Sequence, residues 1–376
     1  MAIFNLIRCL PPEMIAGVVT NRPGELASCL PAHIPLRNME VYQTVFPGGR
    51  GSAANRMGAY LLWTEQRFLD AIRRRFPADL WVVNTLTWPG VVGYAEGHKI
   101  PLVVQVCELE SQLANLTPDQ LEQLVRAPRL MIAISAAVAA MLRALGRTDG
   151  VELCPPALDT AAIVAGVPVA EMRRRLGFPS DAFIWAMAGT LDPNKNPSLF
   201  VDLAERVIAA RPNCRFIWIK GGTEINGYQV FCRMKARSRG LADRIVWTDT
   251  VRSDYYAHLG VCDAFVLPSA RESFSLVSAE ALWLGKPVAA FDCGGVVDVV
   301  PAGGGIIVRP YDTDALVTAM LRIVDGGFAF DAAGARRAIG RCDQSVVAAR
   351  WQELIAAYFG VRAAPATVTA PRVSLA

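Results

Sequence analysis

The sequence predicts an α/β protein built from two Rossmann-like, doubly wound domains. Its 376 residues are enough for two domains that each bury a core. Short β-branched and apolar runs alternate with helical patterns along most of the chain. Such alternation is typical of parallel sheets with helices on both faces. The alternation breaks between Pro155 and Pro179, where proline and glycine cluster.

The apolar runs place the predicted strands on both sides of this break. They lie at residues 80–84, 102–106, 130–134, 183–187, 216–220, 244–247, 264–267 and 288–291. The pattern predicts an N-terminal domain at 1–160 and a C-terminal domain at 161–344. A helix at 345–362 is expected to cross back to the first domain. The tail at 363–376, of Ala, Pro, Thr and Val, is expected to be flexible.

Composition excludes several classes of protein. Charged residues make up 19% and hydrophobic residues 53%, so the chain is not of the disordered type. The longest apolar run, from Leu130 to Leu142, is shorter than the roughly 20 residues that span a bilayer. The first residues lack the features of a secretion signal, and we therefore expect a cytoplasmic protein. The net charge of +4 comes without a basic stripe that carries aromatic residues, so no nucleic-acid partner is expected.

Metal and disulfide sites have little support in the sequence. The nine cysteines are scattered without a Cys-x-x-Cys pair, and the three histidines lie far apart. Asp312 and Asp314 form an Asp-x-Asp pair, but both precede a helical run. N-capping of that helix is therefore the better interpretation.

The most informative segment runs from Cys262 to Ala290. It predicts a strand, a loop at 268–275, a helix at 276–284 and another strand. Unpaired amides at a helix start suit a diphosphate. Glu272 in the loop and Glu280 in the helix can face one cleft, and carboxylates accept hydrogen bonds from vicinal hydroxyls. The segment thus indicates nucleoside and sugar recognition, and the alternative is a helix-dipole partner and a solvated helix residue.

This segment resembles, nearly position for position, the signature of retaining glycosyltransferases of family 4, also called group 1. That family has the GT-B fold, in which two Rossmann-like domains face each other across a cleft. The resemblance implies that Glu272 lies near the transferred sugar and that Glu280 binds the ribose. It also implies that the intervening backbone meets phosphate and sugar oxygens, at Ser273, Phe274, Ser275 and Leu276.

A second stretch, AMAGTLDPNKNP, resembles the family's strand, Gly-Arg loop and phosphate-binding lysine. Gly189 and Lys195 match, and a lysine at this helix entrance can neutralise a leaving diphosphate. An ordinary surface lysine is the alternative. The family's arginine is Thr190 here, so either Lys195 acts alone or another cation, Arg271 or Arg252, substitutes.

Further similarity covers residues 216–222, 244–269 and 293–308. By this resemblance the segment around Trp247 approaches the base, mostly through its backbone. Gly294 and Gly295 would let the chain pass close to a ligand.

The first domain resembles the family's acceptor-side domain less completely. Glu108 matches an acidic residue of the family, and Cys107 stands where many members have a histidine of the sugar pocket. Residues 1–19 look like the first helix and second strand of such a domain, without the preceding strand and Gly-rich loop. Either the chain begins late, or another segment fills the central position of the sheet.

The resemblance implies an enzyme of polysaccharide biosynthesis that transfers a sugar from a UDP- or GDP-linked donor with retention of configuration. The acceptor would be a glycan, a lipid-linked sugar or a small molecule. Neither a metal nor a cofactor is expected, and Glu272 and Lys195 would be the catalytic residues. A nucleotide-sugar-binding protein of the same fold with weak or no activity is the alternative.

The predicted helix at 54–76 has an apolar stripe and a face with several arginines. Core packing with a wet basic face is the default interpretation. The alternative is peripheral contact with anionic lipid at the inner face of the membrane, which suits a lipid-linked acceptor.

Overall fold

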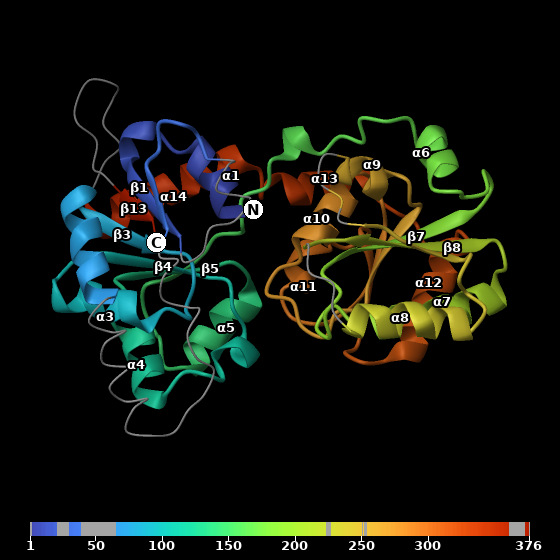
Figure 1. Ribbon diagram of the computed structural model, residues 1–376, viewed down its shortest axis with the longest axis horizontal. Helices are drawn as coiled ribbons and strands as arrows, with labels where there is room; N and C mark the ends of the chain where they lie inside the picture. The colour runs from blue at the N-terminus through green and yellow to red at the C-terminus, as the bar shows by residue number, and fades with distance from the viewer. Residues whose placement is uncertain are drawn as a thin grey trace. The chain divides into compact units, whose positions relative to one another are not determined.

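The computed structural model describes residues 2–20, 30–38, 65–222, 227–249, 251, 254–360 and 373–375. The chain divides into two compact units, of which the first comprises Met1–Leu158 with Cys342–Ala376 and the second Asp159–Arg341. Each unit has one parallel sheet with helices packed on both of its faces (Figure 1). The predicted α/β class is confirmed, whereas the domain bounds drawn from the sequence stay predictions.

The first unit has a seven-stranded sheet in the order β2-β1-β13-β3-β4-β5-β6. The predicted strands β3, β4 and β5 are fully buried, because their β-branched and apolar residues meet helices on both faces. Their ends agree with the prediction to within one residue. The strands are β1 (Ile15–Thr20), β2 (Leu36–Asn38), β3 (Leu80–Val83), β4 (Leu102–Val106), β5 (Leu130–Ala133), β6 (Val151–Leu153) and β13 (Val373–Leu375).

Strand β13 occupies the central position for which the sequence offered no strand. It pairs in parallel with β1, where Val18 faces Leu375, and with β3, where Leu80 faces Val373. Of the two alternatives for this position, the structure thus has another segment filling it. The predicted flexible tail is wrong for these three residues. The backbone N–H and C=O groups of β1 and β3 find hydrogen-bond partners in β13. This strand was not predicted because its three residues are too few to show the periodicity of a strand.

Helices α1 (Ala2–Cys9) and α14 (Gln344–Phe359) lie side by side although they come from opposite ends of the chain (Figure 1). Trp351 and Leu6 are buried between them and the sheet. Residues 65–75 are helical as predicted, and the rest of the predicted helix at 54–64 lies outside the described residues. The other helices of this unit are α3 (Pro89–Gly97), α4 (Pro118–Arg126) and α5 (Ala136–Ala144), with 3-10 turns at Pro12–Met14 and Glu110–Leu113.

The chain leaves the first unit and returns to it at neighbouring points. The Leu158 N–H donates to the Cys342 carbonyl at 2.7 Å, and the Gln344 N–H donates to the Leu158 carbonyl at 2.8 Å. Leu158 and Asp343 form an isolated parallel bridge. The two connecting segments therefore start side by side.

The second unit has a six-stranded sheet in the order β12-β11-β10-β7-β8-β9. The five strands predicted for it are present, with ends within two residues of the prediction. Strand β12 was not predicted as a separate strand. The strands are β7 (Phe183–Gly189), β8 (Cys214–Lys220), β9 (Ile245–Trp247), β10 (Ala264–Leu267), β11 (Val288–Phe291) and β12 (Gly305–Val308).

The helices of the second unit cover both faces of this sheet. The Asp312 carboxylate accepts the Ala315 N–H at 3.0 Å, which confirms N-capping of α12. None of the described helices is both long enough and apolar enough to cross a bilayer. The helices are α6 (Val169–Arg175), α7 (Pro197–Ala210), α8 (Gly227–Ser238), α9 (Tyr255–Gly260), α10 (Leu276–Trp283), α11 (Val296–Val299), α12 (Thr313–Val324) and α13 (Ala332–Gly340), with a 3-10 turn at Thr160–Ala162.

The strand order of the second sheet reverses between β7 and β10. From β7 the chain builds outward through β8 and β9, and it then returns to the other side of β7 with β10. All pairs are parallel, so the carboxyl ends of the strands share one edge. Ligands of open α/β sheets bind outside that edge at such a reversal. The loops after β7 and β10 carry the residues that the sequence singled out.

Candidate functional site

The loops that follow β7 and β10 are joined by Asn194. Its side-chain amide donates to the Arg271 carbonyl at 3.0 Å, and its side-chain oxygen accepts the Arg271 N–H at 3.2 Å. The Asn194 carbonyl also accepts the Ala270 N–H at 2.8 Å. Three hydrogen bonds through one residue hold the two loops as a unit. No pattern in the sequence points to Asn194, because its partners lie 76 and 77 positions away.

A turn built on Asp192 shapes the first of these loops. Its carboxylate accepts the N–H groups of Asn194 at 2.9 Å and Lys195 at 3.1 Å, and it also accepts the Thr190 hydroxyl. Short side chains such as Asp and Asn favour this kind of turn. Asn196 then caps α7 in a left-handed conformation, with φ of 57°. The result is a fixed entry into α7, with Lys195 just before it.

The two residues predicted to be catalytic form an ion pair. The Lys195 Nζ lies 2.6 Å from the Glu272 Oε1, and the two side chains are 22% and 9% exposed. The aliphatic part of Lys195 crosses over Gly189, since a Cβ there would lie 3.5 Å from the lysine chain. The structure thus brings together three residues that lie up to 83 positions apart in the sequence.

Gly294 and Gly295 lie against the loop that carries Glu272. The Glu272 N–H donates to the Cys293 carbonyl at 2.8 Å, and the Gly295 N–H donates back to the Glu272 carbonyl at 2.7 Å. A Cβ on Gly295 would lie only 2.0 Å from the Ser273 carbonyl oxygen. The close approach in the structure is between two protein loops, and contact of these glycines with a ligand stays a prediction.

Helix α10 begins with an unusual residue. Ser275 precedes it in a left-handed conformation, with φ of 79°, and none of the described side chains caps the first turn. The Ser275 hydroxyl is instead 2.8 Å from the Ser278 hydroxyl. Phe274 is buried and anchors the loop. The first amides of α10, starting at Leu276, are therefore not used by a side-chain cap, which leaves them suited to an anion.

Glu280 is held by two tyrosines of α9. The Tyr255 hydroxyl donates to the Glu280 Oε2 at 2.8 Å and the Tyr256 hydroxyl to the Oε1 at 3.3 Å. Burial raises the pKa of Glu280 to about 7, although these hydrogen bonds act to lower it. A carboxylate has about four lone-pair positions, so two remain for the hydroxyls of a ribose. The sequence analysis missed both tyrosines.

Trp247 takes part in an aromatic cluster of the core. Its ring centroid lies 6.0 Å from that of Trp218 and 6.2 Å from that of Phe200. Trp247 is half-buried, and the resemblance implies that this segment approaches a base mostly through its backbone. That approach stays a prediction.

Cys107 and Glu108 lie at the carboxyl ends of β3 and β4 in the first unit. The Glu108 carboxylate accepts the Thr85 hydroxyl at 2.6 Å and the N–H groups of Leu86 and Cys107, each at 3.0 Å. Glu108 thus fixes the loop that follows β3. Burial, with the nearby Glu108 charge, raises the pKa of the Cys107 thiol to about 12, so the thiol stays protonated at neutral pH. Contact of either residue with a substrate stays a prediction.

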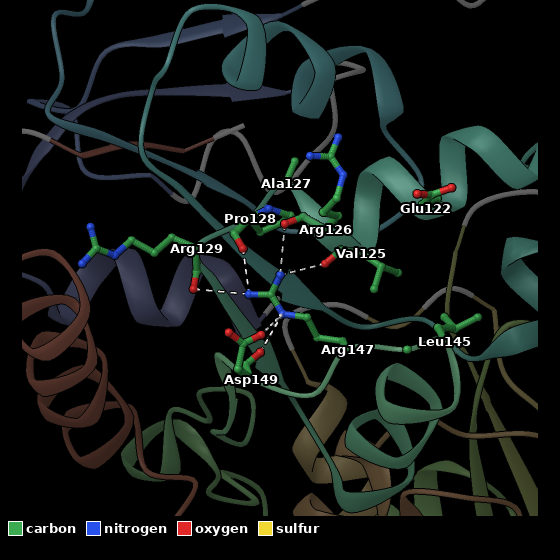
Figure 2. A pocket seen from close by; sticks show the side chains of 10 residues that line it. Glu122, Val125, Arg126, Ala127, Pro128, Arg129, Leu145, Arg147 and Asp149 are labelled. Carbon is green, nitrogen blue, oxygen red and sulfur yellow. Dashed lines mark hydrogen bonds and ion pairs between the residues drawn. The ribbon is translucent and has the colours of Figure 1, made fainter.

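A hollow of about 570 Å³ in the first unit lies at the other edge of its sheet (Figure 2). Arg129 precedes β5 and Asp149 precedes β6, so the hollow is at the amino ends of the strands. The Arg147 guanidinium in it is surrounded by carbonyl oxygens and donates to those of Val125, Arg126, Pro128, Arg129 and Asp149. Arg147 is therefore a structural residue that ties these loops together.

The matching family model covers most of the second unit. Residues 182–326 match the family described as Glycosyl transferases group 1. A D-inositol 3-phosphate glycosyltransferase of Geodermatophilus obscurus is 33% identical over 236 residues, which are 59% of this chain and 52% of that protein. The one of Kribbella flavida is 27% identical over 331 residues, which are 79% of this chain and 76% of that protein. The chain spans about half of the length of several of these curated relatives.

Solved structures agree over nearly the whole chain. HepE of Anabaena, in complex with UDP, has a TM-score of 0.75 at 20% identity and covers 95% of this chain and 96% of its own. Sucrose-phosphate synthase from Thermosynechococcus elongatus has a TM-score of 0.69 at 19% identity and covers 87% of this chain and 84% of its own. At these identities the likeness shows the fold alone. The protein has the GT-B fold, and residues 182–326 of its second unit match the family of glycosyl transferases group 1.

Proposed function

We propose that the protein is a glycosyltransferase that takes a sugar from a nucleoside diphosphate sugar and passes it to a hydroxyl of an acceptor. One observation carries the proposal. The Lys195 ammonium and the Glu272 carboxylate meet at the reversal between β7 and β10, beside the start of α10. An ammonium group and unused amides suit a diphosphate, and a carboxylate suits the hydroxyls of a sugar.

The donor we propose is a UDP-sugar. HepE, which shares the fold, was solved with UDP. The names of the curated relatives suggest that a phosphorylated polyol is one acceptor to test, beside glycans and lipid-linked sugars. The expected cytoplasmic location and the peripheral membrane contact through residues 54–76 stay predictions.

In the proposed reaction the transferred sugar keeps its configuration at C1. The reaction needs no metal. The bond between the sugar C1 and the phosphate oxygen breaks, and the acceptor oxygen bonds to C1 on the same face. The acceptor proton passes to the departing phosphate oxygen, so no protein base is needed. Lys195 and the α10 amides stabilise the charge that develops on the diphosphate. Glu280 holds the ribose, and Glu272 orients the hydroxyls of the sugar.

Two measurements test this proposal. Calorimetry with UDP, GDP and ADP asks which nucleoside diphosphate binds, and we expect UDP to bind best. An assay of UDP release from UDP-sugars, with and without acceptors, then tests whether the protein transfers the sugar. Flat calorimetry with all three nucleotides on folded protein would contradict the proposed donor site. Binding without UDP release from any donor would contradict the transfer.

A further inference from the structure

Lys220 is a buried lysine whose charge has no protein partner among the described residues. It is the last residue of β8 and is only 6% exposed. Its backbone N–H donates to the Thr248 hydroxyl at 2.9 Å, but its ammonium makes no hydrogen bond or ion pair with any residue that the structure describes. Its Nζ is not among the fully enclosed side-chain atoms that lack a partner, so the tip of the chain reaches solvent while the rest is buried. A lysine held in this way, without a carboxylate beside it, suits an anionic ligand.

The neighbouring lysines differ from it in this respect. Lys195 pairs with Glu272 at 2.6 Å. Lys235 pairs with Asp202 at 2.7 Å and also donates to Ser198. Lys220 differs from both in having no carboxylate partner among the described residues.

Strand register directs Lys220 toward the candidate site. Lys220 is the register partner of Gly189 in the parallel pair of β7 and β8. Partner residues of adjacent strands project from the same face of a sheet, with the strands about 4.8 Å apart. A Cβ on Gly189 would lie 3.5 to 3.6 Å from three side-chain carbons of Lys195. The Lys195 chain thus covers the face to which Lys220 belongs, and both lysines lie at the carboxyl edge.

The loop after β7 carries no positive charge at its first position. Thr190 stands there, and its hydroxyl is bonded to Asp192. Of the two arginines considered as substitutes, Arg271 is exposed and Arg252 lies outside the described residues. The adjacent strand end supplies a cation at Lys220, the register partner of Gly189.

We propose that Lys220 binds the diphosphate of the donor together with Lys195, as the second cation of the site. This inference rests on the proposed function and refines it. It assigns a ligand, a phosphate oxygen, to a side chain that the resemblance does not single out.

Replacement of Lys220 by Met tests the assignment, because Met keeps the length and apolar character of the chain and removes the charge. We expect the affinity for UDP to fall by about 10-fold or more. The affinity for uridine, which has no phosphate, is expected to stay unchanged. The melting temperature of the ligand-free variant is expected to hold, because the ammonium that is lost has no partner among the described residues. Lys220→Arg, which retains the charge, is expected to recover much of the UDP affinity.

Lys235→Met is the matched control. It removes a half-buried lysine that has a carboxylate partner, so its melting temperature is expected to fall while UDP affinity persists. Unchanged UDP affinity in Lys220→Met would overturn the role of Lys220 and leave the proposed donor site intact. An equal loss for UDP and uridine, or a fall in melting temperature like that of the control, would indicate a structural lysine and would also overturn it. Failure of the unaltered protein to bind any nucleoside diphosphate would instead contradict the proposed function itself.

Discussion

Replacement of Glu272 by Gln is expected to separate nucleotide binding from sugar transfer. The Lys195 Nζ and the Glu272 Oε1 are 2.6 Å apart, at which distance two unit charges attract by about 6 kcal/mol for an effective dielectric constant of 20. Loss of hydration offsets most of this attraction, and a charge-assisted hydrogen bond leaves a net of about 1.5 kcal/mol. A diphosphate that binds Lys195 must compete with Glu272 for it. Removal of the carboxylate charge should therefore tighten UDP binding by about 10-fold.

The same change is expected to slow transfer. The substituted amide keeps the shape of the side chain but accepts weaker hydrogen bonds from sugar hydroxyls, and loss of one such electrostatic contact lowers turnover by about 100- to 1,000-fold. Calorimetry with UDP and a UDP-release assay with the donor sugar measure the two effects. Glu205→Gln, at a surface ion pair with Arg239, removes the same charge elsewhere and should change neither. Weaker UDP binding in the Glu272 variant, or turnover near normal, would refute the reasoning.

Three further predictions concern the same loops. Gly295→Ala would place a Cβ 2.0 Å from the Ser273 carbonyl oxygen, so we expect loss of UDP release in a folded protein, and full activity would show that the loops can separate freely. Asn194→Ala removes two side-chain hydrogen bonds and should lower the free energy of unfolding by about 1 to 3 kcal/mol in urea titrations; an unchanged midpoint would contradict this bridging role. Because burial raises the pKa of Glu280 from 4.5 to about 7, its contribution to stability is full below pH 4.5 and is lost as the pH rises through 7. UDP affinity should rise with pH through about 7, since ribose hydroxyls donate to the ionised carboxylate, and Glu280→Gln should flatten that profile in calorimetry.

Much of the second unit could be predicted because its local signals agree with its fold. The run from Ala264 to Leu267 is apolar and short, and it is followed by loop residues and a helix-forming stretch. The strand, the loop and the helix were therefore predicted at the correct positions. The same agreement placed Lys195 before a helix and Glu272 in a loop. The resemblance assigned both residues to one site, but their ion pair at 2.6 Å was not predicted.

The remaining parts depend on contacts that no local pattern encodes. Strand β13 is three residues long and is defined by the backbones of β1 and β3. Tyr255 and Glu280 lie on separate helices, 25 positions apart, and only the packing of α9 near α10 brings them together. Lys220 ends strand β8, and its place in the sequence indicates a strand end. That it has no carboxylate partner among the described residues cannot be predicted from this position.

The paired connections at Leu158 and Cys342 bring the two ends of the second unit close together. Its first and last residues start from hydrogen-bonded neighbours, so residues 159–341 form a continuous cassette with adjacent ends. Closing such ends, or grafting them into a surface turn of another protein, adds little loop entropy. The proposed nucleotide site could thus be transferred as one uninterrupted stretch of polypeptide, whereas the first unit can be obtained alone only by joining Leu158 to Cys342.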